Sequence, residues 1–296
     1  MLSVLIPVYN TNCLPLVKSL NRQLLDSKID YEIISIDDAS TTHYADNDTL
    51  NRYSNTTYSI LSENIGRSCI RNMLADKAKY QWLLFLDADT LPVNESFISC
   101  YIRVIESDPR QEVINGGLSY RLADMTRKNQ LRYRYGEKRE SIPYHTRNKA
   151  PYLSLLMSNT LIKRSVFQIT EFNESIKKYG HEDSLFASDL KDKHILVAHI
   201  DNPVYHTGIE DNQIFIGKTK VAIENLWQLY RLGVLKADMN KLLGVYTDLS
   251  GFRMSGVLKG FYTLFYKRIE ALLLKENPSL FLFDLFRLSY LSFIAE

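Results

Sequence analysis

The sequence has few cysteines, and they are not clustered. Cys13, Cys69 and Cys100 lie far apart and form no C-x-x-C pair. A disulfide framework requires an even set of paired cysteines, and a structural zinc site requires closely spaced ligands. The spacing therefore argues against both kinds of site, and we expect three small, buried hydrophobic side chains.

Long uncharged apolar runs and a leader-like start are also missing. Met1 leads directly into a short apolar run with no basic segment and no small-residue cleavage site, so we expect a cytoplasmic location. The Leu- and Phe-rich residues 279–296 are interrupted by Asp284 and Arg287, short of the roughly 18 uncharged residues of a membrane span. This segment is expected to dock onto the core or a second subunit, or to lie peripherally on the inner face of a membrane.

An excess of one charge is absent from the chain as a whole. The 36 basic and 34 acidic residues give a formal charge of +2, which offers no reason to expect a nucleic-acid partner. Residues 121–149 are locally basic, with nine Lys/Arg against three Asp/Glu. Three interpretations stay open for this stretch: a solvated loop, an acceptor-binding loop, or a grip on nucleic acid.

The sequence does contain alternating strand and helix patterns. A chain of 296 residues with 45% hydrophobic content can bury a large core. Its first part predicts successive βα units, hence an α/β domain with a central, mostly parallel sheet flanked by helices. Strands are expected over residues 3–7, 31–37, 58–61, 81–87, 112–118 and 153–163, and helices over 14–24 and 67–79. Residues 1–210 are expected to form this domain, and residues 211–296 a helical C-terminal region.

The predicted strands end in polar residues. Tyr9, Asp38 and Asp87 each follow a different strand. Open parallel sheets bind ligands outside the carboxyl ends of their strands, so we expect these three side chains to converge on one site.

Two carboxylates, Asp87 and Asp89, lie two residues apart at the end of the strand over residues 81–87. Positions i and i+2 of an extended chain point to the same side, where two anions repel each other. A hard divalent cation, Mn²⁺ or Mg²⁺, would resolve the repulsion and could also hold a diphosphate. The alternative is an Asp-rich turn that caps a helix near Pro92.

Further motifs accompany this pair in a fixed order. They are VLIPVYN at residues 4–10, IDDAS at 36–40, NIGR at 64–67 leading to Arg71-Asn72, and GHED at 180–183. With the D-x-D pair, the set resembles glycosyltransferase family 2 over roughly residues 1–210. The resemblance implies the Rossmann-like GT-A fold and inverting transfer of a sugar from a nucleotide diphosphate sugar to a hydroxyl of a glycan or glycolipid acceptor. It also implies a role in polysaccharide or glycolipid assembly. The expected donor is a UDP-sugar.

The resemblance assigns a nucleotide-binding role to several residues. It implies that Pro7, Val8 and Tyr9 contact the nucleotide, where an aromatic ring can stack on a base. It implies that Asp38 accepts the N–H of uracil, with an Asx-turn as the alternative.

The resemblance also places basic side chains near the diphosphate. Arg67 and Arg71 lie at the matching positions, and a guanidinium suits phosphate oxygens. The alternative is that one of them forms a salt bridge with Asp76 or Glu63.

The implied metal site involves three residues. Asp87 would face the ribose, close to the metal, and Asp89 would bind Mn²⁺ or Mg²⁺. His206 would complete the metal shell or touch the diphosphate, and a packing role is its alternative.

An inverting transfer also needs a base for the acceptor hydroxyl. Asp183 matches the family's base position, with Glu182 orienting the acceptor, or the two exchange roles. The alternative is an acid-rich first helical turn after Gly180.

Two other functions compete with this interpretation. Residues 87–91 (DADTL) approximate the signature of aspartate-nucleophile phosphatases, with one residue missing before the threonine. A non-catalytic module that binds sugar nucleotides or glycans is the second. The segment IGKT at residues 216–219 resembles the end of a P-loop, but Asn212 stands where its first glycine is required.

Overall fold

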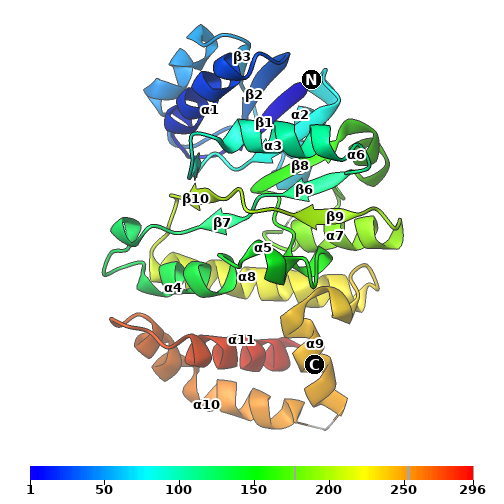
Figure 1. Cartoon of the computed structure of the whole chain (residues 1–296). Coiled ribbons are helices and arrows are strands. Elements are labelled where there is room, and N and C mark those ends of the chain that lie inside the picture. Colours follow the sequence, from blue (N-terminus) through cyan, green and yellow to red (C-terminus); the bar gives the residue numbers. More distant parts are fainter. Residues whose placement is uncertain (177, 252–253, 296) are drawn as a thin grey trace.

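The computed structural model describes residues 1–176, 178–251 and 254–295. Residues 252, 253 and 296 of the expected C-terminal helical region lie outside the described residues, as does residue 177. Figure 1 shows the chain from the sheet at its N-terminal end to the helices at its C-terminal end.

Four strands form the parallel half of a seven-stranded sheet, and the sequence predicted all four. In chain order they are β1 (Leu2–Val8), β2 (Tyr31–Asp37), β3 (Thr56–Ile60) and β4 (Trp82–Leu86). Their spatial order is β3-β2-β1-β4, and each adjacent pair is parallel. From β1 the chain adds β2 and β3 on one side of the sheet and then β4 on the other side. At such a switch point between β1 and β4, a crevice forms beyond the carboxyl ends of the strands.

The other half of the sheet is mixed. It consists of β8 (Asn159–Lys163), which is antiparallel to both β4 and β6 (Val113–Asn115), and β9 (Val197–His199) at the edge, parallel to β6. The strand expected over residues 153–163 is therefore too long. A 3₁₀ turn, η3 (Tyr152–Ser154), follows Pro151, and pairing begins only at Asn159.

A second, three-stranded sheet adjoins the carboxyl end of β4. Its strands are β5 (Thr90–Pro92), β7 (Leu118–Ser119) and the central β10 (Val204–His206). β10 pairs antiparallel to β5, with His206 opposite Thr90. This register brings residue 206 beside the Asp87–Asp89 segment, although more than one hundred residues separate them in sequence.

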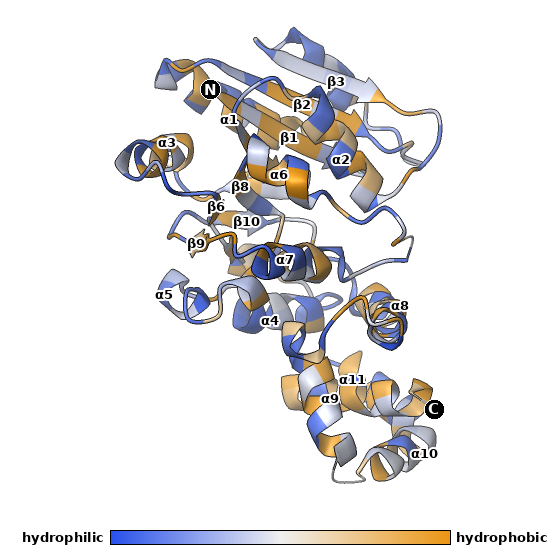
Figure 2. Ribbon diagram, turned by 90° about the vertical axis from the view of Figure 1, so that its right-hand side faces the viewer, coloured by the Kyte–Doolittle hydropathy of each residue, from blue (hydrophilic) through white to orange (hydrophobic). Residues whose placement is uncertain are grey.

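Helices cover both faces of the large sheet. On one face lie α1 (Leu14–Ser27) and α3 (Phe97–Ser107), and on the other α2 (Arg67–Lys77), α6 (Arg164–Thr170) and α7 (Glu182–Asp192). Of the strands between them, β1, β2 and β4 are buried along nearly their whole length and largely apolar (Figure 2), as is typical of sheets buried on both faces. The α/β class, with a mostly parallel sheet flanked by helices, agrees with the sequence prediction.

The basic stretch is folded, so its interpretation as a solvated loop is wrong. It contains η2 (Leu122–Asp124), α4 (Gln130–Arg139) and α5 (Tyr144–Arg147). Arg147 is buried because its guanidinium donates to the carbonyls of Asn115, Gly116 and Ile200, among others. The sequence did not predict these helices because charged side chains face both the interior and the solvent here, so no apolar helical periodicity is visible.

The C-terminal part is helical, as expected. Its elements are α8 (Asn212–Arg231), η4 (Ala237–Met239), α9 (Lys241–Gly251), α10 (Ser255–Leu273) and α11 (Leu280–Ile294). In the first part of the chain, the 3₁₀ helix η1 (Ala45–Arg52) lies between β2 and β3. Phe283 and Phe286 of α11 are fully buried and belong to the same apolar cluster as Leu5 and Phe85 of the sheet. Among the described residues, no helix is long and apolar enough to cross a bilayer. The boundary near residue 210 stays a prediction.

Candidate active site

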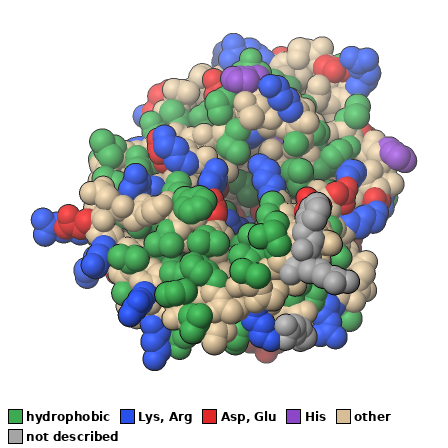
Figure 3. All heavy atoms as spheres, turned by 90° about the horizontal axis from the view of Figure 1, so that it is seen from below, with side chains coloured by type: hydrophobic (Ala, Val, Ile, Leu, Met, Phe, Trp, Pro, Cys, Tyr) green, Lys and Arg blue, Asp and Glu red, His purple; other side chains and the backbone are tan. Residues whose placement is uncertain are grey.

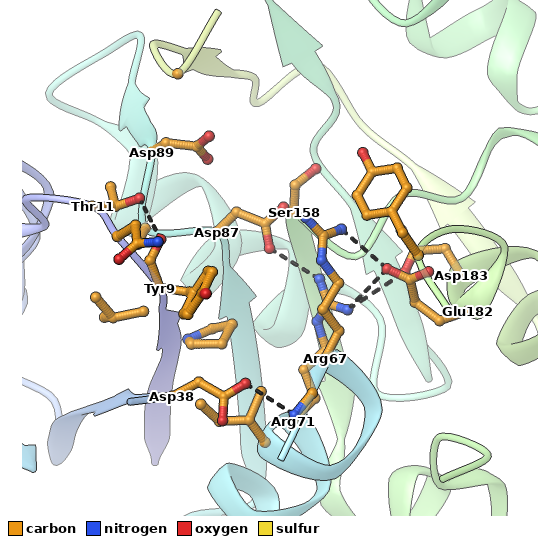
Figure 4. A pocket seen from close by; sticks show the side chains of 18 of the residues that line it. Tyr9, Thr11, Asp38, Arg67, Arg71, Asp87, Asp89, Ser158, Glu182 and Asp183 are labelled. Atoms are coloured by element: carbon orange, nitrogen blue, oxygen red, sulfur yellow. Dashed lines mark hydrogen bonds and ion pairs between the residues drawn. The ribbon is translucent and has the colours of Figure 1, made fainter. Parts of the chain in front are cut away.

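A cavity of about 1010 Å³ lies at the carboxyl ends of β1, β2 and β4. Every site residue predicted from the sequence lines it. These residues are Pro7, Val8, Tyr9, Asp38, Arg67, Arg71, Asp87, Asp89, Glu182, Asp183 and His206. They come from six segments of the chain, which the crevice of the sheet brings together (Figure 4).

Asp38 holds the loop that precedes α2. Its two carboxylate oxygens accept the amide N–H groups of Ile65 (2.7 Å) and Gly66 (3.0 Å). Gly66 has φ of 87°, a conformation that disfavours any other residue at this helix start. The alternative of an Asx-turn at Asp38 is therefore not what its carboxylate forms, and the local side-chain bond is made by the neighbouring Asp37, whose Oδ1 accepts the amide of Ser40 (2.7 Å). Asp38 thus shapes this end of the cavity through the backbone.

Arg71 is a buried cation among three carboxylates. Its Nη2 donates to Oδ1 of Asp87 (3.0 Å), and its Nη1 lies 3.7 Å from Oε1 of Glu182 and 3.9 Å from Oδ1 of Asp183. The Arg71 side chain is only 4% exposed. A buried guanidinium in this position neutralises anions that would otherwise repel one another.

Arg67, one helical turn earlier, is different because its side chain is 55% exposed. It donates to Oε1 of Glu182 (3.2 Å) and lies over the ring of Tyr179, 4.7 Å from its centroid. Within the described part of the chain, neither arginine pairs with Asp76 or Glu63, so that alternative is wrong. Of the two, Arg67 is the one whose cation can reach a ligand in the cavity.

Glu182 and Asp183 begin α7 and have opposite protonation behaviour. Burial raises the pKa of Asp183 to about 6, against a smaller opposing effect of Arg71. For Glu182, burial is outweighed by Arg67 and Arg71, so its pKa is lowered. Two neighbouring carboxyls with diverging pKa values are a common feature of acid–base sites.

The Asp183 carboxylate is held by one bond only. Oδ2 accepts the amide of Met157 (3.0 Å), whereas Oδ1 has no hydrogen-bond partner among the described residues. A buried acceptor that faces a cavity without a partner is ready to accept a proton or a hydroxyl from a ligand.

Asp87 and Asp89 are not in an extended segment, as the sequence argument assumed. The amide of Thr90 donates to the carbonyl of Asp87 (3.1 Å), so residues 87–90 form a turn. Both carboxylates nevertheless line the cavity. In Figure 4, Asp87 lies between Asp89 and the cluster of arginines and acids on α2 and α7.

Asp89 faces His206 across the small sheet. Its Oδ2 lies 3.6 Å from Nε2 of His206, and burial raises the pKa of the Asp89 carboxyl despite the histidine. Gly208 packs so closely on Asp89 that a Cβ there would collide with the carboxylate. Thr207 donates its amide and hydroxyl to the Asp89 carbonyl (both 2.8 Å). The Asp89 backbone is therefore fixed from β10.

A polar network from the basic stretch supports His206. The ring of Tyr120 stacks on the imidazole, with centroids 5.6 Å apart and an interplanar angle of 22°. Arg132 donates to the Tyr120 hydroxyl (3.1 Å) and to Glu140 (3.1 Å), and the same hydroxyl donates to Glu140. Gly136 on α4 lies against the Tyr120 ring, which a Cβ at that position would overlap.

Sequence reasoning missed several cavity residues. Arg132 and Glu140 line the cavity from the basic stretch, and Tyr179 and Lys218 line it from other segments. Lys218 belongs to the dismissed P-loop lookalike, and it pairs with Glu210 and lies 5.5 Å from the Tyr179 ring centroid. The local sequence of α8 gives no signal for this contact, because it depends on how α8 packs across the sheet edge.

The described residues contain no cluster of three or more metal-ligating side chains. Asp89 and His206 supply one carboxylate and one imidazole, and Nδ1 of His206 is buried without a partner among the described residues. Mn²⁺ or Mg²⁺ in nucleotide sites often takes only one or two protein ligands and completes its shell with phosphates and water. The donor set therefore fits such a cation.

Comparison with known sequences gives one family. The profile of "Glycosyl transferase family 2" matches residues 3–168, which is more than half of the chain. No curated protein matches the chain significantly.

Several solved structures resemble the chain. They include S. aureus TarS 1-349 (TM-score 0.52, 18% identity, covering 76% of this chain and 64% of that one) and its complex with UDP (0.51, 18%, 76% and 64%). A third is the mannosyltransferase PcManGT from Pyrobaculum calidifontis in complex with GDP-Man and Mn²⁺ (0.54, 14%, 78% and 64%). The matched region thus spans about 64% of each of these chains. At such low identity these likenesses concern the fold.

Proposed function

The chain belongs to glycosyl transferase family 2 and has the GT-A fold, and from this premise we propose that it is an inverting, metal-dependent sugar transferase. Its substrates would be a nucleotide diphosphate sugar and a hydroxyl of a glycan or glycolipid acceptor. The observation that carries the proposal is the position of Asp183. This carboxyl, with its raised pKa, lines the same cavity as Asp89 and His206.

The donor nucleotide would lie at the end of the cavity formed by β1 and β2. Pro7, Val8 and Tyr9 provide its floor, and the half-exposed Tyr9 ring can stack on a base. Each Asp38 oxygen accepts one backbone N–H and retains a second lone pair, which can accept the N–H of uracil. Solved relatives support this assignment, since TarS structures contain UDP and UDP-GlcNAc.

The diphosphate would lie between Asp89 and Arg67. Asp89 and His206 would hold Mn²⁺ or Mg²⁺, and Asp87, fixed by Arg71, would face the ribose beside it. When bound, the cation would offset the charge that develops on the leaving diphosphate. The complex of PcManGT with GDP-Man and Mn²⁺ supports a metal in this fold.

Asp183 would take the proton of the attacking hydroxyl. A carboxylate with a pKa of about 6 is mostly ionised at neutral pH, yet is more basic than an ordinary aspartate. Glu182, held ionised by the two arginines, would orient the acceptor. The N-terminus of a helix is favourable for acidic side chains. The alternative of an acid-rich first turn in α7 therefore explains the presence of both acids, but it does not explain their opposite pKa shifts.

Family membership argues against the aspartate-nucleophile phosphatase. Its nucleophile would be Asp87, and Oδ1 of that side chain already accepts a hydrogen bond from Arg71. A measurement of turnover distinguishes an enzyme from a non-catalytic module that only binds sugar nucleotides or glycans.

We propose that the transfer reaction takes part in polysaccharide or glycolipid assembly, as the sequence resemblance implies.

The proposal is tested by incubating the chain with UDP- and GDP-sugars in Mn²⁺ and measuring release of the nucleoside diphosphate. Release with at least one donor, lost in Asp183→Asn while UDP still binds, is the expected result. UDP binding without turnover for any donor and acceptor would favour the non-catalytic module. Phosphate release from phosphomonoesters, unaffected by UDP-sugars, would favour the phosphatase.

A further inference from the structure

The outer face of α10 is apolar and exposed. Val257, Leu264 and Leu272 are 69%, 75% and 47% exposed, and spacings of seven and eight residues place them along one side of the helix. Phe265 lies next to this stripe. The opposite side of α10 is buried and carries Tyr262, Ile269 and Leu273.

The start of α11 extends this surface. Phe281 is the most exposed of the large hydrophobic side chains in the described residues, at 78%. We define the C-terminal apolar face as Val257, Leu264, Phe265, Leu272 and Phe281. Seen from below, hydrophobic side chains gather over this end of the molecule, with Lys and Arg side chains among and around them (Figure 3). Exposed apolar patches of this kind usually mark a contact surface.

The acidic residues of α10, α11 and their connection are neutralised. Each forms an ion pair with a basic residue: Glu270 with Lys220, Glu276 with Arg127, and Asp284 with Arg139 and Arg287. These acids therefore contribute little net negative charge to the face.

Three basic side chains beside the face have no such partner. Lys267, Arg268 and Lys275 are exposed, and within the described part of the chain none of them forms an ion pair. Arg268 lies on the stripe itself, four residues from both Leu264 and Leu272. The C-terminal apolar face therefore carries uncompensated positive charge.

We propose that the C-terminal apolar face docks onto an anionic lipid surface, with α10 lying in the plane of the membrane. Apolar side chains with interspersed cations are the combination that binds the boundary between acidic headgroups and acyl chains. A second copy of the chain is the less favourable occupant, because a twofold interface would bring the same three cations of both copies together. Among the described residues no helix can span a bilayer, so the contact is interfacial.

The inference does not rest on the proposed transfer reaction. None of the residues that line the catalytic cavity belongs to α10 or α11. Membrane binding and UDP binding can therefore be measured separately, and the failure of one leaves the other standing.

The test is co-sedimentation of the full chain with lipid vesicles. We expect binding to vesicles of phosphatidylcholine with phosphatidylglycerol, weak binding to phosphatidylcholine alone, and loss of binding at high salt. Replacing Lys267, Arg268 and Lys275 by Gln should weaken binding roughly fivefold per cation removed. The double variant Leu264→Ser/Phe281→Ser should weaken it at least about tenfold.

The matched control is Leu196→Ser, which changes a 65%-exposed leucine just before β9, outside α10 and α11. It should bind vesicles like the wild type, and all variants should retain the wild-type melting temperature. Equal binding to neutral and anionic vesicles, no binding at all, or equal loss in the control would overturn the proposal. The proposal would also be overturned if the chain did not bind vesicles but formed a concentration-dependent dimer that Leu264→Ser abolishes.

Discussion

Oδ1 of Asp183 and Nη1 of Arg71 lie 3.9 Å apart, and neither atom has a hydrogen-bond partner among the described residues. The arginine is close enough to stabilise the carboxylate but not to occupy its free oxygen. Arg71 is instead hydrogen bonded to Asp87. This arrangement leaves Oδ1 of Asp183 free to contact a ligand in the cavity while the charge of the carboxylate stays compensated.

Asp183→Asn should abolish transfer and preserve donor binding. The amide keeps an oxygen for the Met157 N–H but cannot take a proton, and a lost general base costs about 10²–10⁴ in rate. Steady-state turnover with calorimetric UDP affinity measures both. Glu182→Gln is the matched comparison. Undiminished turnover in Asp183→Asn, with strong loss in Glu182→Gln, would exchange the two roles.

The same substitution should stabilise the protein at neutral pH. The pKa of Asp183 is raised in the folded state from 3.8 to about 6, so the folded chain binds this proton more tightly than the unfolded chain. The loss of this proton therefore costs stability, and the cost grows as the pH rises from about 4 to 6 and is fully present above pH 6. Asp183→Asn should increase the free energy of unfolding at pH 7.5 by about 1–3 kcal/mol.

The gain should shrink as the pH falls from about 6 to 4, because in this range only the folded wild type holds the proton, so a lower pH stabilises it relative to its unfolded chain. Urea denaturation at several pH values measures this. A gain that does not change with pH would show that the raised pKa of this carboxyl is not its origin.

The two arginines of α2 should respond differently to removal. Arg71→Ala leaves three carboxylates without their buried cation and should cost about 3–5 kcal/mol of folding stability. Arg67→Ala removes a half-exposed cation, which should cost less than about 1 kcal/mol yet weaken UDP binding. Thermal denaturation and calorimetry separate the effects. Equal destabilisation by both substitutions would contradict the distinct roles assigned to them.

Sequence patterns located the cavity because its first residues follow strands directly. Tyr9, Asp38 and Asp87 end three parallel strands, so local order predicts their convergence. The contributions of Tyr120, Arg132 and Lys218 could not be predicted in this way. Their positions depend on the packing of α4 and α8 against the small sheet, which no local periodicity encodes.

The backbone conformation at Asp87 and Asp89 also could not be predicted from the sequence. A strand ending in Asp87 suggested an extended segment, but the chain turns at residues 87–90 to enter β5. The Thr90–Asp87 hydrogen bond closes the turn, and β5 after it pairs with the distant β10, which no local pattern indicates. The charge-rich residues 130–139 likewise form a helix whose buried side includes Arg132, a residue type usually expected in solvent.

Gly136 should be needed to hold His206. A Cβ at residue 136 would overlap the Tyr120 ring that stacks on His206, so Gly136→Ala should cost about 1–3 kcal/mol and weaken UDP binding in Mn²⁺. Gly217→Ala, a helix position with nothing within 4 Å, is the control and should be neutral or stabilising. Equal stability and equal UDP affinity of the two variants would show that the packing of Tyr120 does not support the site.

The most direct test of the account measures UDP affinity by calorimetry in Mn²⁺ and in chelator, for the wild type and for Asp89→Asn. If a divalent cation joins Asp89 and His206 to the diphosphate, Mn²⁺ should tighten binding by about tenfold or more in the wild type and have little effect in the variant. Wild-type affinity that is the same in Mn²⁺ and in chelator would contradict the account.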